Sequence, residues 1–267
     1  MIWKILLYAL LGYVVLCSLV FIFQRKMLYL PMGNKLSEQN ALAGGLRYWP
    51  SFDNFQGFVS QEPAGPKGTV IIFHGNAGAA YHRDYYLKAL SLQGVRVILA
   101  EYPGYGGRAG NPSESKLVDD ALDTIKLAYQ EFGKPLYLWG ESLGAGIVSS
   151  AVSQTDIPIK GIVMFTPWDS LPNLAQTHYW YLPARWLVLD KYDNVENLQG
   201  FEGNVAVVLA GNDEVVPVGH GKMLYDSITT NKKLWLFEDT MHNEMPIDAE
   251  LHWWREVVEF ISEGARK

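Results

Sequence analysis

The sequence of 267 residues predicts an α/β fold with a mostly parallel central sheet, helices on both of its faces and one N-terminal transmembrane helix. Short runs of β-branched and aromatic residues alternate with segments of helical length, which is the pattern of parallel strands joined by helices. Hydrophobic residues make up 49% and charged residues 19% of the chain, as in a globular protein rather than a disordered one. An uncharged run near the N-terminus is long enough to cross a bilayer.

The N-terminal run from Ile5 to Phe23 contains no charged residue. As a helix it would be about 28 Å long, close to the roughly 30 Å hydrocarbon core of a membrane. Positive residues flank both ends (Lys4, then Arg25 and Lys26), so the charges do not decide which side the domain faces. A cleaved signal peptide is the alternative, but the run is long for one and no A-x-A-like site follows it. We expect residues 1–26 to be a retained anchor that crosses the membrane once.

Residues 27–45 are polar and contain glycine, so we expect a linker before one domain that covers residues 46–267. Residues 46–60 suggest short antiparallel strands, and Thr69–Phe73 is typical of a strand buried on both faces. The other expected strands are Val95–Leu99, Pro135–Trp139, Ile159–Phe165, Val205–Ala210 and Lys233–Phe237. The expected helices cover residues 80–92, 113–132, 143–154 and 249–262, with one more after Pro217. Ligands bind beyond the carboxyl ends of such strands.

The net charge of -6 and the absence of a basic stripe argue against nucleic acid as a partner. The single cysteine, Cys17, can form no internal disulfide, and no Cys/His cluster has the spacing of a zinc site. We therefore expect neither a metal nor an organic cofactor. The sequence leaves the oligomeric state open.

Gly140-Glu141-Ser142-Leu143-Gly144 lies between an expected strand and an expected helix. It fits the pattern G-x-S-x-G, in which the chain turns sharply and leaves the serine hydroxyl exposed at the start of the helix. Glycines are needed because the turn leaves no room for side chains. A serine that only caps the helix is the alternative. The position directly after a buried strand favours Ser142 as a nucleophile.

A serine hydroxyl needs a base that removes its proton. His242 follows the last expected strand and precedes the terminal helix, at the sheet edge where a base is needed. Asp213 follows the strand before it and would orient the imidazole. The chain order Ser142, Asp213, His242 is that of one large class of serine hydrolases.

Other acids and histidines compete for these roles. Asp169 also follows a strand and is the main alternative acid, whereas Glu214 should point away and Asp239 should be a loop residue. The remaining histidines that fall on helices or on an insert are expected to be solvated or packed: His82, His178, His220 and His252.

Developing negative charge on a substrate oxygen needs backbone N–H donors. Leu143, directly after the nucleophile, supplies one. The loop His74-Gly75-Asn76-Ala77-Gly78 after the first buried strand should supply the other, with Asn76 as the candidate. An ordinary glycine-rich turn is the alternative. The loop lacks the Gly-Lys-Ser/Thr ending of a nucleotide site.

Five segments of the chain now allow a comparison with a known family. They are residues 74–78, Tyr102-Pro103-Gly104-Tyr105-Gly106, residues 140–144, Gly211-Asn212-Asp213 with Val216-Pro217, and His242-Asn243. Together they resemble the membrane-anchored α/β-hydrolase-domain serine hydrolases, in the branch of lysophospholipase-like and thioesterase-like enzymes, over about residues 25–265. The resemblance implies an α/β-hydrolase fold of about eight strands. The sequence departs from this family at Pro103, where an arginine is often found, with Glu101 two residues before it. This departure concerns the polarity of the loop that contains both residues.

About residues 167–203 lie between two expected strands, where this fold usually carries a lid insert. Its aromatic residues include Trp168, Tyr179, Trp180, Tyr181, Trp186 and Tyr192. Such a cluster suits an acyl chain. It would also serve to pack the lid onto the body, and some of it to touch the bilayer.

The sequence thus predicts a serine hydrolase that cleaves carboxylic esters or thioesters of small, acyl or lipid-like substrates through an acyl-enzyme. A protein or lipid thioesterase resembling a depalmitoylase is one alternative. A catalytically inactive membrane scaffold on the same fold is another. A third possibility is another reaction on this fold, such as peptide cleavage or haloalkane chemistry. A serine rather than an aspartate at the elbow disfavours haloalkane chemistry.

Overall fold

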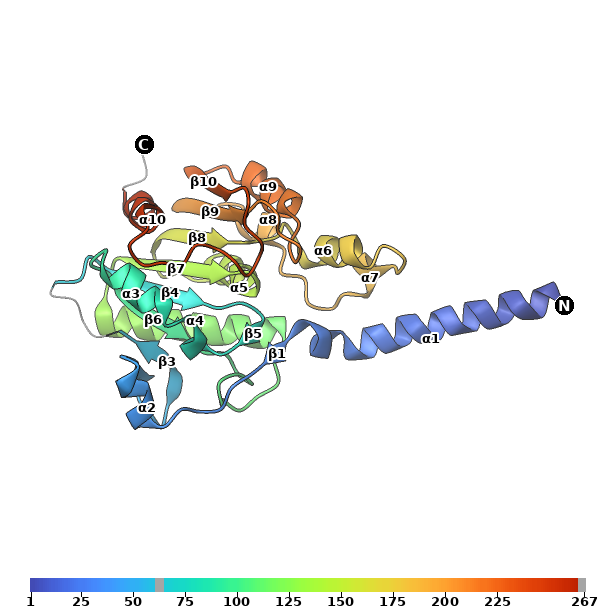
Figure 1. Cartoon of the computed structure of the whole chain (residues 1–267), viewed down its shortest axis with the longest axis horizontal. Helices are drawn as coiled ribbons and strands as arrows, with labels where there is room; N and C mark the ends of the chain where they lie inside the picture. The colour runs from blue at the N-terminus through green and yellow to red at the C-terminus, as the bar shows by residue number, and fades with distance from the viewer. Residues whose placement is uncertain (61–64, 264–267) are drawn as a thin grey trace.

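The centre of the molecule is an eight-stranded sheet, shown in Figure 1 in a computed structural model that describes residues 1–60 and 65–263. Its strand order is β10-β9-β8-β7-β4-β6-β3-β2, and β3 alone runs in the direction opposite to the other seven strands. The strands are β2 (Arg47–Pro50), β3 (Phe55–Val59), β4 (Thr69–Phe73), β6 (Arg96–Ala100), β7 (Leu136–Glu141), β8 (Ile159–Phe165), β9 (Asn204–Ala210) and β10 (Lys232–Phe237). The predicted mostly parallel sheet is confirmed.

Helices cover both faces because alternate residues of the central strands point to opposite sides. The helices that follow these strands are α3 (Tyr85–Ser91), α4 (Glu114–Phe132), α5 (Leu143–Val152), α9 (Val218–Ser227) and α10 (His252–Ser262). Ile71 and Phe73 of β4 belong to one buried cluster with residues of α4 and α5. Val70 and Ile72 belong to a second cluster with residues of α3 and α10. The continuous apolar run of β4 is therefore explained by burial on both faces.

Two helix boundaries differ from the prediction by three residues or more. The helix expected over residues 80–92 begins as a 3-10 turn, η1 (Ala80–Arg83), before α3. The terminal helix begins at His252 rather than at Ala249, because the chain first makes a turn in which Leu251 N–H donates to Asp248 O.

The segment predicted as a linker contains two short elements that contact the domain. β1 (Leu30–Pro31) pairs in parallel with β5 (Ala77–Gly78), which lies in the loop after β4. Ser37 caps α2 (Glu38–Ala43) by accepting a 3.2 Å hydrogen bond from Asn40 N–H. Residues 27–45 therefore hold the end of the first helix against the loop that follows β4.

The first helix, α1 (Ile2–Leu28), projects away from the sheet (Figure 1) and has no buried residue. One of its 18-residue stretches has a mean hydropathy of 2.6. Among residues 1–60 and 65–263 it is the one helix long and apolar enough to cross a bilayer, a test that a signal sequence also passes. Arg25 and Lys26 lie in its last turn, where positive charge is favourable.

The predicted lid insert corresponds to the connection between β8 and β9. It contains α6 (Leu171–His178), α7 (Ala184–Leu187) and α8 (Asn194–Asn197). Its aromatic residues differ in exposure, and Tyr179 is half-buried. Trp168 and Tyr192 are buried in the body, whereas Trp180, Tyr181 and Trp186 are exposed. Packing therefore explains only part of the cluster.

Candidate active site

Ser142 lies between β7 and α5 in a backbone conformation that side chains rarely adopt. Its φ is 51°, in the left-handed region. A Cβ on Gly140 would lie 2.4 Å from the carbonyl oxygen of Gly144, and a Cβ on Gly144 would lie 1.8 Å from that of Phe73. Close packing of the helix on the strands therefore requires both glycines. This is the geometry of a nucleophile elbow.

Asp213 and His242 are in direct contact. Nδ1 of His242 lies 2.7 Å from Oδ2 of Asp213. The other carboxylate oxygen of Asp213 accepts the N–H groups of Val215 at 2.9 Å and Val216 at 2.6 Å, which fixes its orientation. An ionised carboxylate can only accept, so Nδ1 of His242 carries a proton and Nε2 is available as a base.

The three candidate residues reach the same edge of the sheet from different strands. Ser142 follows β7, Asp213 follows β9 and His242 follows β10, each beyond the carboxyl end of its strand. Within the described residues no hydrogen bond joins Ser142 Oγ to His242 Nε2, a contact that often tightens only in the substrate complex. Their catalytic roles stay a prediction.

The competing acids are occupied elsewhere. The carboxylate of Glu214 accepts the backbone N–H of His242 at 3.2 Å, so Glu214 positions the loop of the base. Asp169, the main alternative acid, lies 2.6 Å from Nδ1 of His220. Both side chains of this second pair are buried, which agrees with the expectation of a packed His220. Asp169 therefore does not orient His242.

Asn76 is held by three hydrogen bonds in the loop after β4. Its carbonyl accepts Leu30 N–H at 3.0 Å and the Tyr105 hydroxyl at 2.9 Å. Its side-chain Nδ2 donates to the carbonyl of Leu28 at 3.0 Å. Leu143 is the first residue of α5, where a backbone N–H has no acceptor within the helix. These two residues remain the candidate oxyanion donors.

A buried contact between a histidine and a carboxyl group, which the sequence did not predict, lies behind this loop. His74 Nε2 is 3.1 Å from the carboxylate of Glu101, and His74 Nδ1 is 2.7 Å from the carbonyl of Gly75. The Gly75 carbonyl can only accept, so Nδ1 of His74 donates to it. Glu101 also accepts Ala80 N–H at 2.9 Å and Tyr102 N–H at 3.2 Å. Glu101, noted in the sequence as part of an unusual loop, therefore anchors the residues that carry Asn76.

A polar cleft of about 220 Å³ adjoins the candidate base. Its lining includes His82, Arg83, Glu141 and His242. Arg83 and Glu141 form an ion pair at 2.7 Å. Burial by itself raises the pKa of the Glu141 carboxyl, but the Arg83 guanidinium and the hydrogen bond from Tyr85 outweigh it and leave that pKa below its ordinary value. The cleft is thus lined by the candidate base and by Glu141, the residue that precedes the candidate nucleophile Ser142.

No group of three or more His, Cys, Asp or Glu side chains is placed to hold a metal ion in the described ranges. The arrangement at the sheet edge can instead support nucleophilic attack, proton transfer and stabilisation of an oxyanion.

Comparisons with known proteins are in keeping with this geometry. The family described as serine aminopeptidase, S33, matches residues 64–190, a range that includes Asn76 and Ser142 and ends before Asp213 and His242. The lysophosphatidylserine lipase ABHD12 of Danio rerio is 33% identical over 184 residues, which are 62% of this chain and 48% of that protein. An uncharacterized protein of Mycobacterium tuberculosis is 29% identical over 83% of this chain and 81% of its own length. The chain thus spans about half the length of the lipase that it matches.

Solved structures share the fold at low sequence identity. The esterase Pf2001 of Pyrococcus furiosus has a TM-score of 0.66 at 16% identity, and the match covers 89% of this chain and 99% of that one. Est1E of Butyrivibrio proteoclasticus, solved with ferulic acid, has a TM-score of 0.65 at 19% identity over 77% of this chain and 96% of that one.

Proposed function

We propose that the chain is a serine hydrolase that cleaves carboxylic esters of acyl or lipid-like substrates, because residues 64–190 match the family described as serine aminopeptidase, S33, on an α/β-hydrolase fold. The observation that carries the proposal is the contact of His242 with Asp213 at the sheet edge where the strained Ser142 lies. The homologous lipase supports a lipid-like substrate.

The reaction follows from the roles of these side chains. Ser142 Oγ attacks the carbonyl carbon of the ester while His242 Nε2 takes its proton. The N–H groups of Leu143 and Asn76 stabilise the oxyanion of the tetrahedral intermediate. The intermediate collapses, and His242 gives its proton to the departing alcohol, which leaves an acyl-Ser142 ester. Water, deprotonated by His242, attacks this ester, and the carboxylic acid leaves as Ser142 regains its proton.

A retained membrane anchor is the second part of the proposal. α1 is apolar and unburied and has basic residues in its last turn, all of which support a single crossing. Mass spectrometry of the protein extracted from membranes tests this directly. The anchor requires residues 1–26 to be present in the mature protein, and their removal would identify α1 as a cleaved signal.

Activity is tested with p-nitrophenyl esters of rising acyl length, using the full chain in detergent micelles. The wild type should release p-nitrophenol and prefer the longer esters, and Ser142→Ala should be inactive. Ser153→Ala, at the other end of α5, is the matched control and should behave as the wild type. Cleavage of short esters alone would contradict the lipid-like substrate, and equal activity of Ser142→Ala would contradict the mechanism.

A further inference from the structure

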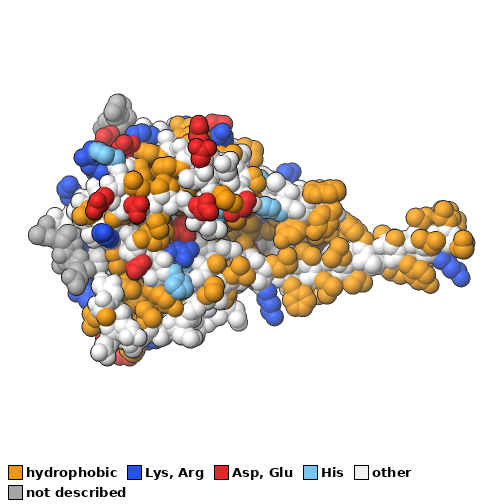
Figure 2. Space-filling model, in the orientation of Figure 1, with side chains coloured by type: hydrophobic (Ala, Val, Ile, Leu, Met, Phe, Trp, Pro, Cys, Tyr) orange, Lys and Arg blue, Asp and Glu red, His pale blue; other side chains and the backbone are white. Residues whose placement is uncertain are grey.

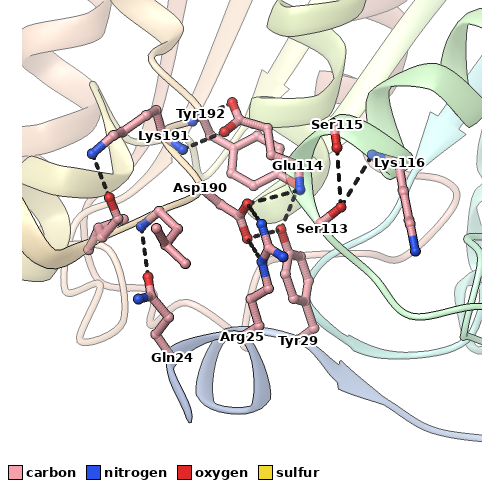
Figure 3. Close-up of polar contacts among 12 residues, drawn as sticks. Gln24, Arg25, Tyr29, Ser113, Glu114, Ser115, Lys116, Asp190, Lys191 and Tyr192 are labelled. Carbon is pink, nitrogen blue, oxygen red and sulfur yellow. Dashed lines mark hydrogen bonds and ion pairs between the residues drawn. The ribbon is translucent and has the colours of Figure 1, made fainter. Parts of the chain in front are cut away.

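The base of α1 is bonded to the lid insert (Figure 3). The guanidinium of Arg25 binds both carboxylate oxygens of Asp190, at 2.9 and 3.0 Å. The hydroxyl of Tyr29 lies 3.0 Å from Asp190 and 3.0 Å from the hydroxyl of Tyr192. The Asp190 side chain is only 5% exposed. These contacts hold residues 190–192 of the lid insert against the C-terminal end of α1.

From this base the lid runs alongside α1 toward its N-terminus. Gln24 accepts Leu189 N–H at 2.7 Å and donates to Leu187 O at 3.1 Å. Farther along, the hydroxyl of Tyr13 donates to Tyr181 O at 3.0 Å. Tyr13 and Gln24 are separated by about 16 Å along a helix that rises 1.5 Å per residue. Because Tyr13 lies midway along the uncharged run, the lid reaches the level at which α1 would be inside the hydrocarbon core.

We define the lid tip as residues 179–189, and its surface suits lipid rather than water. Trp180 is 78% and Trp186 82% exposed, and Tyr181 and Leu189 are also exposed. Arg185 is the one charged residue of the tip, and long basic side chains extend to the interface. Figure 2 shows hydrophobic side chains continuing from the long helix onto the adjoining part of the domain. Tryptophan and tyrosine are the side chains preferred at membrane interfaces.

The irregular backbone of the tip is hydrogen-bonded by uncharged side chains. Gln176 donates to Leu182 O at 3.0 Å, to Trp180 O at 3.4 Å and to Tyr179 O at 3.5 Å, and it accepts Arg185 N–H at 3.2 Å. Together with Tyr13 and Gln24, it satisfies polar groups that water would otherwise satisfy. Non-helical backbone enters a membrane only when its polar groups are satisfied within the protein.

An apolar groove of about 170 Å³ lies between α1 and the lid. Its lining includes Val20, Met27 and Leu28 of α1 and Leu174, Leu182 and Leu187 of the lid. The Leu28 carbonyl accepts the hydrogen bond from Asn76, the candidate oxyanion donor. The groove thus begins beside the part of α1 that would lie in the bilayer and ends at the residue that is bonded to the oxyanion loop.

We propose that the lid tip is immersed in the leaflet on the domain's side and that the groove takes the acyl chain of a substrate lipid directly from that leaflet. The proposal rests on the proposed function and on the retained anchor. The apolar groove would hold the acyl chain, and the polar cleft beside His242 and Glu141 would hold the head group. An amphipathic ester is the substrate class that fits both.

Immersion is measured without reference to activity. The full chain is placed in phosphatidylcholine vesicles whose acyl chains carry bromine, which quenches nearby tryptophan fluorescence. Trp3, Trp180 and Trp186 are the exposed tryptophans within residues 1–60 and 65–263. The double variant Trp180→Phe, Trp186→Phe should lose roughly two thirds of the quenchable emission, if membrane-facing indoles contribute equally. The buried Trp235→Phe is the matched control and should lose none. Unchanged quenching in the double variant would overturn immersion of the lid.

Entry of the acyl chain is tested with a variant whose larger side chain fills the groove. Val20→Trp places a large side chain in it, whereas Val15→Trp changes a residue of α1 that faces away from it. We compare kcat/KM for an oleoyl lysophospholipid in vesicles with kcat/KM for p-nitrophenyl acetate. The ratio of the first to the second should fall on the order of tenfold or more in Val20→Trp, as expected for an altered apolar subsite. Val15→Trp should keep the wild-type ratio. An unchanged ratio in Val20→Trp would overturn the groove as the acyl site.

The proposed function and the acyl groove are contradicted by different results. Wild type that hydrolyses neither substrate and reacts with no fluorophosphonate would overturn the proposed function. Wild type that hydrolyses both, with an unchanged ratio in Val20→Trp, would overturn only the further inference.

Discussion

Asp169 accepts a hydrogen bond of 2.6 Å from Nδ1 of His220, in a buried pair that closely resembles the contact of Asp213 with His242. The difference between the two pairs lies at the second ring nitrogen. Nε2 of His220 is 3.0 Å from the hydroxyl of Thr177, so both nitrogens of this ring are occupied. His242 instead lines the polar cleft with its ring available. The first pair therefore stabilises the lid insert against α9, and the second is the candidate for catalysis.

Exchanging each aspartate for asparagine separates these roles. Asp213→Asn should lower kcat for p-nitrophenyl esters by about 10⁴, because an amide no longer holds the imidazole in its reactive tautomer. Asp169→Asn should leave kcat within a few-fold of wild type and lower the free energy of unfolding by about 3 kcal/mol, because a buried pair is broken. Ester kinetics and urea unfolding check both variants. A reversed pattern would make Asp169 the catalytic acid.

Stability should fall at acid pH through Asp169. Burial raises the pKa of this carboxyl, but hydrogen bonds from His220 and Asn173 outweigh burial and leave the pKa below its ordinary value. Its contribution to stability is thus fully present above the unfolded pKa of about 4 and is lost as pH falls through the lower folded pKa. The difference in unfolding free energy between wild type and Asp169→Asn should shrink in that window. The exposed Asp239→Asn is the control, because it removes a carboxylate without breaking a buried pair.

The elbow glycines should tolerate no side chain. Gly144→Ala would place a Cβ 1.8 Å from the carbonyl oxygen of Phe73, so the variant should fold poorly or lose all esterase activity. Gly219→Ala in α9 meets nothing within 4 Å and should be neutral or stabilising by up to about 1 kcal/mol. Circular dichroism melting and ester hydrolysis distinguish the two. An active, stable Gly144→Ala would contradict the geometry of the elbow.

The contact of α1 with the lid insert should control how often this part of the insert separates from α1. Asp190→Ala removes the acceptor shared by Arg25, Tyr29 and the N-terminus of α4 (Figure 3). Loss of a buried acceptor that has one charged partner, Arg25, should cost about 3 kcal/mol in local stability. Amide hydrogen exchange over residues 187–193 should become faster. The exposed Glu196→Ala is the control, and equal exchange in both variants would show that the contact does not hold the lid.

The parts of the fold and of the candidate site that could be predicted depend on short stretches of sequence and on the order of the strands. The run Thr69–Phe73 predicted β4 because burial on both faces leaves a continuous apolar sequence. Gly140 and Gly144 predicted the elbow because a sharp turn selects glycine locally. The approach of Asp213 to His242 followed from strand order, because parallel strands bring their carboxyl ends to one edge.

The features missed depend on contacts between distant segments. Nothing local to Glu101 indicates that its carboxylate reaches His74, 27 residues earlier in the chain. Likewise, residues 27–45 look like a linker in the sequence because the strand partners of Leu30 and Pro31 are Ala77 and Gly78, which lie far along the chain in the loop after β4. The partner of Asp169 could not be chosen from sequence either, since His220 and His242 both follow suitable strands.

The central claim is that Ser142 is a nucleophile activated by His242, and labelling by a fluorophosphonate probe tests it most directly. The wild-type chain in micelles should be labelled, with the probe attached to the peptide that contains Ser142. Ser142→Ala and His242→Ala should remain unlabelled while they keep the wild-type circular dichroism spectrum, and Ser153→Ala should be labelled as the wild type is. A folded wild type that takes up no probe, or a folded Ser142→Ala that is labelled normally, would contradict the claim.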